Sequence, residues 1–438
     1  MRFSTAATLA LAASLATTAF AQITPTRVGP VSQYGQLMTG KNSSGKGQIY
    51  GSCEGVKDGA EVQVRGMSLY WSLMPQAVEF WSEEGVSTMV RDMNIQIVRA
   101  AMATGNEDWQ GGYKGYASDP NTQKNLVKTV VEAAIKNDIY VIIDWHSHEA
   151  HKQTDAAKNF FKEMAETYGQ YDNVIIEVYN EPQQISWSEV KNYANQVIQV
   201  IRQYSDNLVL VGNPSWDQNP SDAIGNEVND SKKNTAYTLH YYANSHMWSG
   251  NYDWGGESEG SKGEKAMNAG LSVFVSEWGT ANSDGNGNPD QSRNKSWQDY
   301  MNKHKLSWAN WSASYINEGT AAFQDGSNKN SLQYTTSGNL VKGYLATNPT
   351  SYKACKAEEE VGIKAPAIAG GFSVSLEGKT LNIAGGNANV EIYSLLGNKF
   401  MAVENVSGAL SLASLPSGSY VVRVNTKEGS KTMRVQVR

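Results

Sequence analysis

The sequence predicts an α/β chain in which a (β/α)8 barrel, the TIM-barrel architecture, precedes a small all-β, sandwich-like domain. Eight strand-like runs alternate with helix-like segments through most of the 438 residues, which is the order expected of a barrel. No glycine-rich phosphate-binding loop follows the first strand, and this argues against an open dinucleotide-binding sheet. From residue 372 onward the chain changes to short β runs separated by turn residues.

The chain divides into four expected segments. Residues 1–21 indicate a secretory signal peptide, because Arg2 precedes an alanine- and leucine-rich run that ends in Ala19-Phe20-Ala21. Residues 22–355 form the expected barrel domain, 356–371 a linker and 372–438 the β domain. Since no later apolar run is long enough to span a membrane, we expect a secreted or cell-surface protein without a membrane span.

The expected barrel strands are short apolar runs that end in polar or aromatic residues. They cover residues 62–69, 95–102, 139–146, 174–181, 208–212, 235–242, 271–279 and 306–311. Helix-like segments are expected at 83–93, 121–137, 155–168, 186–204, 291–304 and 340–347. Ser186 and Glu189 have the spacing of a capping box at the start of one helix. In the tail, strands are expected at 372–376, 380–383, 390–394, 410–412, 420–425 and 431–437.

Composition narrows the classes of ligand. The net charge is −6, so no basic face for nucleic acid is implied. All 12 Trp residues lie between Trp71 and Trp311, where they could fill a core or stack on sugar rings. The two cysteines, Cys53 and Cys355, flank the expected barrel. Export would permit a disulfide between them, and two free thiols are the alternative.

Polar residues gather where the expected strands end, which is the catalytic face of a barrel. Glu181 and Glu277 end two strands about a hundred residues apart. Taken singly, each polar residue could be structural, but their recurrence on most of the strands favours one shared site. The other members are Arg99, His146, His148, Asn180, His240, Tyr242 and Trp311.

Two carboxyl groups that flank one bond are the equipment of glycoside hydrolysis. Arg99 is expected to keep Glu277 ionised, whereas Glu181, farther from the cation, is expected to have a raised pKa. The histidines lie on different strands and no H-E-x-x-H spacing occurs, so no metal is expected. No G-x-S-x-G motif indicates a serine hydrolase.

Residues 62–322 resemble glycoside hydrolase family 5, in particular its bacterial endo-β-1,4-glucanases. The motifs that carry the likeness are RGMSLYWS (65–72), IVRAAM (97–102), IIDWHSH (142–148), YNEP (179–182), YTLHYYA (237–243), FVSEWG (274–279) and WANWS (308–312). The resemblance implies a retaining mechanism on a β-1,4-glucan, without a cofactor, in a chain expected to be a monomer. It implies that Glu181 is the acid/base and Glu277 the nucleophile.

The resemblance also implies roles for the surrounding residues. Arg99 and Tyr242 would hold the nucleophile, and Asn180 would bind the sugar 2-hydroxyl. His146 and His240 would line the same subsite, and Trp311 would stack on a sugar ring. Further cleft aromatics are expected at Trp71, Trp187 and Trp216. One departure concerns an Asp-Lys pair common in such enzymes: Tyr315 and Ile316 stand in its place, with Glu318 retained.

The tail resembles C-terminal sorting domains of the type IX secretion pathway, through IYSLLG (392–397) and LPSGSY (415–420). It would then have the secretion machinery as a partner. A carbohydrate-binding module is the rival interpretation, but the tail contains no Trp. For the barrel, the alternatives are a β-mannanase, a xyloglucanase or a mixed-linkage glucanase on the same site. A catalytically idle glycan-binding protein is the alternative from another class.

Overall fold

The computed structural model describes residues 23–105, 113–355, 373–377, 379–394, 399–416, 418–427 and 429–437. The chain forms two compact units, within residues 1–355 and 356–438, and each is described by itself. The expected signal peptide (1–21) and linker (356–371) lie outside the described residues. In the described part of the chain, no helix has both the length and the apolar character needed to cross a membrane.

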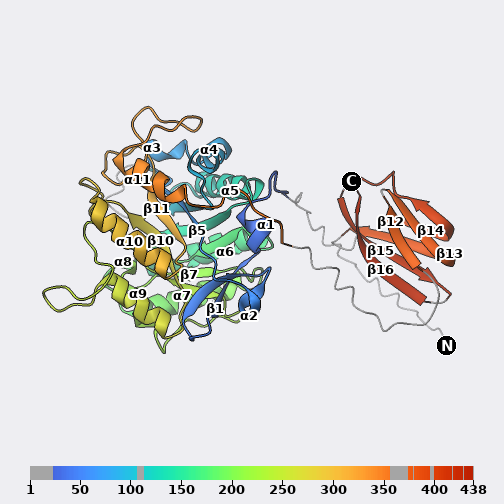
Figure 1. Cartoon of the computed structure of the whole chain (residues 1–438), viewed down its shortest axis with the longest axis horizontal. Coiled ribbons are helices and arrows are strands. Elements are labelled where there is room, and N and C mark those ends of the chain that lie inside the picture. Colours follow the sequence, from blue (N-terminus) through green and yellow to red (C-terminus); the bar gives the residue numbers. More distant parts are fainter. Residues whose placement is uncertain are drawn as a thin grey trace, which may run out of the picture. The chain divides into compact units, whose positions relative to one another are not determined.

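The first unit is the predicted barrel, which the structure confirms (Figure 1). Its parallel strands follow one another around the barrel in sequence order, and the pairing of β10 with β11 closes the ring. The strands are β3 (Arg65–Leu69), β4 (Ile97–Ala103), β5 (Tyr140–His146), β6 (Val174–Glu177), β7 (Val209–Val211), β8 (Thr235–Thr238) with its continuation β9 (Tyr241–Tyr242), β10 (Val273–Gly279) and β11 (Trp308–Ala313).

Helices cover the outside of this barrel (Figure 1). The longer ones are α4 (Glu83–Met93), α5 (Pro120–Lys136), α6 (Thr154–Tyr168), α7 (Trp187–Ile201), α9 (Glu259–Asn268), α10 (Gln291–Lys303) and α11 (Thr336–Leu345). The expected capping box is present at α7, where the Ser186 hydroxyl accepts from the Glu189 N–H and Glu189 accepts from the Ser186 N–H. After β7 the chain forms only the short α8 (Pro214–Asp217) and η3 (Pro220–Ala223). Shorter helices are α1 (Pro30–Tyr34), α2 (Gly55–Asp58), α3 (Pro75–Val78) and η2 (Ala150–Lys152).

Strand alternation separates two apolar cores. Because successive strand residues face opposite sides, one set faces the helices and the other fills the barrel. Val98, Val141 and Ile176 belong to the large core under the helices. Their neighbours Ile97 and Ile142 belong to a separate core inside the barrel. The remaining barrel-strand residues of that inner core are Tyr140, Ile175, Leu210, Ala236 and Phe274, and Leu208 directly precedes β7.

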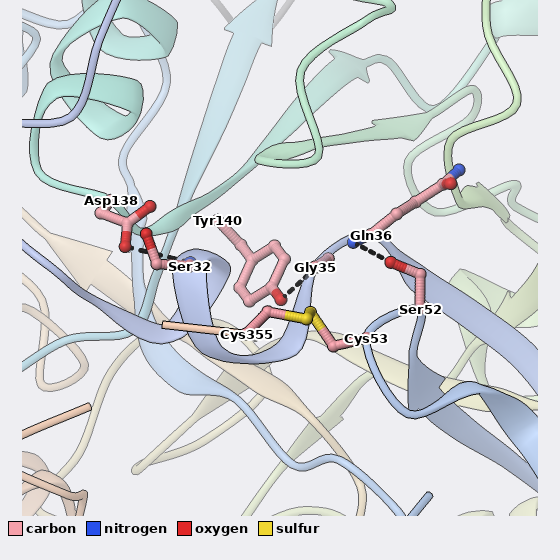
Figure 2. Close-up of a disulfide and its surroundings, with 8 residues drawn as sticks. All are labelled: Ser32, Gly35, Gln36, Ser52, Cys53, Asp138, Tyr140 and Cys355. Atoms are coloured by element: carbon pink, nitrogen blue, oxygen red, sulfur yellow. Dashed lines mark hydrogen bonds between the residues drawn. A yellow bond between two sulfur atoms is a disulfide. The ribbon is translucent and has the colours of Figure 1, made fainter. Parts of the chain in front are cut away.

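The N-terminal segment covers the end of the barrel where the strands begin. The hairpin of β1 (Leu37–Lys41) and β2 (Gly47–Gly51) contacts that end, as Ser272 just before β10 donates to the Gln48 carbonyl. Figure 2 shows the disulfide between Cys53 and Cys355, whose Cα atoms are 5.8 Å apart. Beside it, Tyr140 at the start of β5 donates to the Gly35 carbonyl at 2.6 Å.

Two expected strands differ in detail from the observed ones. The strand expected through Glu181 ends at Glu177, although Val178 still donates its N–H to Leu210. The strand expected at 235–242 is interrupted between β8 and β9, because the His240 N–H turns away to the Asp217 carbonyl. In both places the backbone leaves the strand ladder close to a predicted site residue, Glu181 in the first case and His240 in the second.

The second unit is an antiparallel β sheet, as expected for an all-β tail. Its strands pair in the order β12-β13-β15-β16, with β14 also on β13. They are β12 (Ser373–Glu377), β13 (Thr380–Ser394), β14 (Lys399–Ser411), β15 (Gly418–Thr426) and β16 (Gly429–Val437). Two of the expected short strands, 380–383 and 390–394, are thus fused into the long β13, and the strand expected at 410–412 overlaps the end of the longer β14. Apolar residues such as Val390, Ile392 and Val422 form this unit's own core.

Candidate active site

Glu181 and Glu277 meet at the end of the barrel where the strands finish. Glu277 lies in β10 and Glu181 four residues after β6. One carboxylate oxygen of each lies within 4.8 Å of the other and of a His240 nitrogen. The pair is close enough to act on the same bond from two sides.

Arg99 is the centre of a buried charge cluster beneath this pair. Its guanidinium contacts Asp144 at 2.9 Å, Glu177 at 2.7 Å and Glu277 at 2.8 Å. It also donates to the Asn180 side-chain oxygen at 2.7 Å. One cation therefore faces three carboxylates, and together these contacts fix the side chains of Glu277 and Asn180.

Asp144 and Glu177 are site residues that our sequence analysis did not single out. Both are fully buried. The signal was the two-residue period of the strands: Arg99 follows Ile97 by two positions, Asp144 follows Ile142, and Glu177 follows Ile175. Each charged residue is thus the next inward-facing position after an apolar one. A charge on the inward side of a buried strand needs a partner.

Glu277 is held at both carboxylate oxygens. Tyr242 donates to Oε1 at 2.8 Å and Arg99 to Oε2 at 2.8 Å. Burial and the nearby charge of Glu181 raise the pKa of Glu277, against the opposing effects of His240, Arg99 and Tyr242. The carboxylate is fixed in place and poorly solvated, which suits a group that must attack a carbon atom.

Glu181 is held by two imidazoles and by a strained backbone. Its φ of 49° lies in the left-handed region, and its N–H donates to Asp217 at 3.1 Å. His240 Nδ1 lies 3.0 Å from Oε1 and His148 Nε2 3.3 Å from Oε2. Burial acts to raise the pKa of Glu181, but hydrogen bonds from both histidines outweigh it and lower this pKa to about 2.

The expected order of the two pKa values was therefore wrong. We expected Glu181 to have the raised pKa and Glu277 to be kept ionised by Arg99. In the structure the pKa of Glu277 is raised and that of Glu181 is lowered. The reason is that Arg99 is shared among three carboxylates, whereas Glu181 contacts two imidazoles, those of His148 and His240.

The pKa of His240 is shifted in the opposite direction from that of Glu181. Burial acts to lower the pKa of His240, but Asp217, Glu177, Glu181 and Glu277 together raise it well above its ordinary value. Its Nε2 lies 2.8 Å from the Ser276 hydroxyl and 3.5 Å from Asp217. Burial raises the pKa of Asp217 itself to about 7.

Asp217 and Ser276 also escaped our sequence analysis. Ser276 is the inward-facing residue after Phe274, so the strand period could have found it. Asp217 reaches the Glu181 N–H through a left-handed run at Ser215, Trp216 and Asp217, whose φ angles are 62°, 56° and 59°. No pattern in the sequence marks that conformation.

Aromatic rings form one wall of the site. His146 is stacked on Trp311, with ring centroids 5.3 Å apart, and lies edge-on to Trp71 at 4.0 Å. Its Nδ1 lies 2.7 Å from Asp144, which links this wall to the Arg99 cluster. Burial, followed by the charge of Arg99, lowers the pKa of His146 well below its ordinary value, so the ring is neutral.

Glu318 and Ile316 lie on the same side. Tyr70 donates to Glu318 at 2.9 Å, and the Tyr70 ring contacts Trp311 with centroids 4.9 Å apart. Ile316, at the position where the enzymes that this sequence resembles commonly carry a lysine, packs against the cluster of Trp71 and Trp311. An apolar contact therefore replaces a cation at this edge.

The remaining predicted tryptophans differ in position. Trp216 is half-buried, and its backbone N–H donates to the carbonyl of Pro182, the residue after Glu181. Trp187 is not at the site: it is buried against Tyr237 and donates its indole N–H to the Asn226 carbonyl at 2.9 Å. Trp187 is therefore a core residue, and the expectation that it lines the cleft is corrected.

The Asn180 side chain keeps a donor that none of the described residues accepts. Its side-chain nitrogen is buried and has no hydrogen-bond partner among the described residues. His240 and Glu277, in contrast, use both of their polar atoms within the protein. Of these three residues, Asn180 alone retains a donor for a bound hydroxyl.

A cavity of about 310 Å³ lies at the end of the barrel where the strands begin. It is lined by β1 and the segments that lead into β8 and β10, and none of the predicted site residues lines it.

Known proteins with the same features were found by sequence and by structure. Residues 56–317 match the family model "Cellulase (glycosyl hydrolase family 5)". Endoglucanase Z of Dickeya dadantii is 43% identical over 67% of this chain and 64% of its own length. The chain thus spans just under two thirds of that relative.

Two solved structures resemble the barrel. A thermostable, halotolerant GH5 cellulase from an Icelandic hot spring isolate is 30% identical, with a TM-score of 0.64, over 74% of this chain and 98% of its own. The catalytic domain of endoglucanase Cel5A from Thermobifida fusca, solved with cellotetraose, is 28% identical, with a TM-score of 0.62, over 73% of this chain and all of its own. The chain belongs to the cellulase family, glycosyl hydrolase family 5.

Proposed function

We propose that this protein is an endo-β-1,4-glucanase that hydrolyses its substrate with retention of configuration. The observation that carries the proposal is the spacing of Glu181 and Glu277, whose nearest carboxylate oxygens lie within 4.8 Å. Retaining glycosidases hold their two carboxyl groups about 5–5.5 Å apart, whereas inverting ones leave about 6.5–9.5 Å for a water molecule.

In the first step Glu277 attacks the anomeric carbon while the glycosidic oxygen takes a proton from Glu181. Tyr242 and Arg99 hold the two oxygens of Glu277 in fixed directions, which lowers the entropic cost of reaching the attacking geometry. The bond between the anomeric carbon and the leaving oxygen breaks, and an ester to Glu277 forms.

In the second step water attacks the ester and Glu181 accepts its proton. Glu181 must then be ionised, which is the state its two imidazole partners favour. The bond to Glu277 breaks, the carboxylate returns to Arg99 and Tyr242, and the product keeps the β configuration.

The proton for the first step comes from the Glu181–His240 pair. The raised pKa of His240 and the lowered pKa of Glu181 favour this proton on His240, whose Nδ1 lies 3.0 Å from Glu181 Oε1. Binding of a sugar excludes water from the site and brings the glycosidic oxygen to Glu181, and both changes favour the neutral pair, imidazole with carboxylic acid. The acid is thus formed by a short proton transfer within the pair.

Several features support a glucan as the substrate. Trp71 and Trp311 form an aromatic wall suited to sugar rings, and the Asn180 nitrogen, which has no partner among the described residues, can donate to a hydroxyl at the cleavage point. Matched relatives are named endoglucanases or cellulases. A panel of carboxymethyl cellulose, mixed-linkage glucan, xyloglucan and mannan, assayed for reducing sugar, tests the choice. Faster release from mannan than from cellulose would overturn it.

Stereochemistry tests the mechanism directly. NMR spectra recorded in the first minutes of hydrolysis should show the β anomer before the α anomer appears by mutarotation. An α anomer as the first product would overturn the retaining mechanism, while leaving the substrate assignment intact.

For the tail we propose a role in export rather than in binding cellulose. The motifs at 392–397 and 415–420 resemble type IX sorting domains, and the tail lacks tryptophan. Removal of residues 356–438 should leave the enzyme inside a type IX-competent host, whereas the full chain appears outside. Equal release of both forms would contradict this role.

A further inference from the structure

Trp254 is the most exposed large hydrophobic side chain in the described residues, at 77% of its surface. A single exposed hydrophobic residue is common and needs no explanation. What sets this indole apart is that its surroundings hold it in a fixed position.

A short hairpin carries the ring. Tyr252 donates its N–H to the Gly256 carbonyl, and Gly255 donates to the Tyr252 carbonyl, both at 2.8 Å. The Trp254 ring is stacked on Tyr252 with centroids 5.1 Å apart and planes 8° apart. A side chain at Gly256 would overlap the indole, so glycine is needed to admit the ring.

The stack is tied to the body of the barrel. The Tyr252 hydroxyl donates to Glu259 at 2.5 Å, and Glu259 is buried in the first turn of α9. The exposed indole is therefore held by a ring whose far end is fixed to a helix. A surface group fixed in this way loses little conformational freedom when a ligand binds.

The hairpin belongs to the catalytic side of the barrel. It lies in the segment that joins β9 to α9 (Figure 1). Tyr242, which contacts Glu277, ends β9. Arg293 holds the base of the segment by donating to the Ala243 and His246 carbonyls at 2.7 and 2.8 Å.

The chemistry of the hairpin fits a neutral sugar chain. Residues 243–258 contain Asp253 and Glu257 but no lysine or arginine, which disfavours a polyanion. Asn251, Asp253 and Gly255 around the ring are exposed and not apolar. The patch is therefore too small for a stable protein interface, whereas one sugar ring can stack on one indole.

We propose that the stacked pair of Tyr252 and Trp254 is an accessory binding site for a neutral β-1,4-glucan chain, outside the catalytic cluster. This inference rests on the proposed function, since the glucan is the substrate that the active site would cut. The stacked pair binds a part of a long glucan chain that lies beyond the cleavage point. It should matter for polymers and not for short substrates.

The test measures binding without hydrolysis. In the Glu277→Gln background, native gels containing hydroxyethyl cellulose give the dissociation constant from the retardation of each variant. We expect Trp254→Ala to raise this constant about fivefold and Trp254→Phe to keep it within about twofold of the parent. Tyr204→Ala is the matched control. Tyr204 is an exposed aromatic just after the C-terminal end of α7, and its replacement should leave the dissociation constant unchanged.

Activity provides an independent measurement. In the otherwise native enzyme, Trp254→Ala should lower the ratio of activity on hydroxyethyl cellulose to activity on an aryl cellobioside about fivefold. Unchanged retardation in Trp254→Ala, an equal loss in Tyr204→Ala, or a parent that the polymer does not retard would each overturn the inference. Failure of the native enzyme to release sugar from any β-1,4-glucan would instead overturn the proposed function.

Discussion

The two ends of the barrel are built from the same strands, yet their inward-facing residues serve different purposes. Near the start of the strands, Ile97, Ile142 and Phe274 form an apolar core. Two residues further along these strands stand Arg99, Asp144 and Ser276. One step of the strand period thus separates residues that contribute stability from residues that contribute charge.

The difference teaches where this fold tolerates buried charge. Arg99 faces three carboxylates and is fully buried, an arrangement whose desolvation cost can exceed its ion-pair energy. The opposite end offers the means to offset that cost: an apolar core, a hairpin and a disulfide. Changes at the two ends should therefore separate activity from stability.

The largest effect is expected from the catalytic pair. Glu277→Ala should lower kcat by about 10⁴-fold or more, because no covalent intermediate can form. With an activated aryl glycoside, azide should restore turnover and give an α-glycosyl azide, since the anion fills the space left by the carboxylate.

Glu181→Ala should respond differently to the same anion. An aryl leaving group needs little protonation, so the ester to Glu277 still forms, but its hydrolysis lacks a general base. Azide should then give the β-glycosyl azide. Two variants that yield the same anomer, or the opposite ones, would contradict the roles assigned to both glutamates.

A second comparison uses one buried arginine at each end. Arg99→Met leaves Asp144, Glu177 and Glu277 without their cation, so the free energy of unfolding should fall by about 3–5 kcal/mol. kcat/KM should also fall about 10²-fold or more, because Glu277 loses the guanidinium group that fixes one of its carboxylate oxygens.

Arg202→Met is the matched control. Arg202 pairs with Asp230 at 2.7 Å, both side chains are almost fully buried, and it also donates to the Asn207 carbonyl before β7. We expect a similar loss of stability with little change in kcat/KM. Since all 12 Trp lie between residues 71 and 311, tryptophan fluorescence reports unfolding of the barrel alone. Equal loss of activity in both variants would erase the distinction between the ends.

The disulfide gives a smaller effect at the stable end. Cys53→Ser should lower the free energy of unfolding by about 2–5 kcal/mol, since the bond closes a span of 302 residues. Reduction of the native protein should have the same effect, and kcat should not change. Reduced and oxidised protein that unfold at the same urea concentration would show that the bond contributes nothing.

Much of this architecture was predictable from the sequence, for a definite reason. Strand ends in a barrel converge, so Glu181, Glu277 and Arg99 could be expected at one place without knowledge of the coordinates. The two-residue period could also have identified Asp144 and Glu177. These inferences depend only on which strand a residue belongs to and on which side it faces.

What could not be predicted depends on loops and on shared partners. Asp217 reaches Glu181 only because three successive residues adopt left-handed backbone angles. The order of the pKa values of Glu181 and Glu277 depends on how many charged partners each carboxylate has. That number cannot be deduced from the sequence. Trp187 is an aromatic residue of the kind that lines sugar-binding clefts, but it packs against Tyr237 in the core.

The smallest effect tests the proton shared by His240 and Glu181. Asp217 lies 3.5 Å from His240 Nε2, and its charge is the main influence that raises the pKa of His240. The active form needs one proton on the His240–Glu181 pair, so kcat/KM should fall at alkaline pH as that proton is lost. The pKa of Asp217 is about 7, so its charge is fully present only above that pH.

Asp217→Asn removes the charge while keeping an oxygen that can accept from the Glu181 N–H. Without the neighbouring anion the pKa of His240 falls, so the alkaline limb of kcat/KM should move to lower pH by about one unit. Near pH 5, where Asp217 is protonated in the native enzyme, the two should have nearly the same activity. Asp222→Asn removes the charge of an exposed residue in η3 and serves as the control, because Asp222 is among neither the partners of His240 nor those of Glu181. An alkaline limb that stays in place, or that moves upward, would mean that the proton used by Glu181 is not the one held on His240.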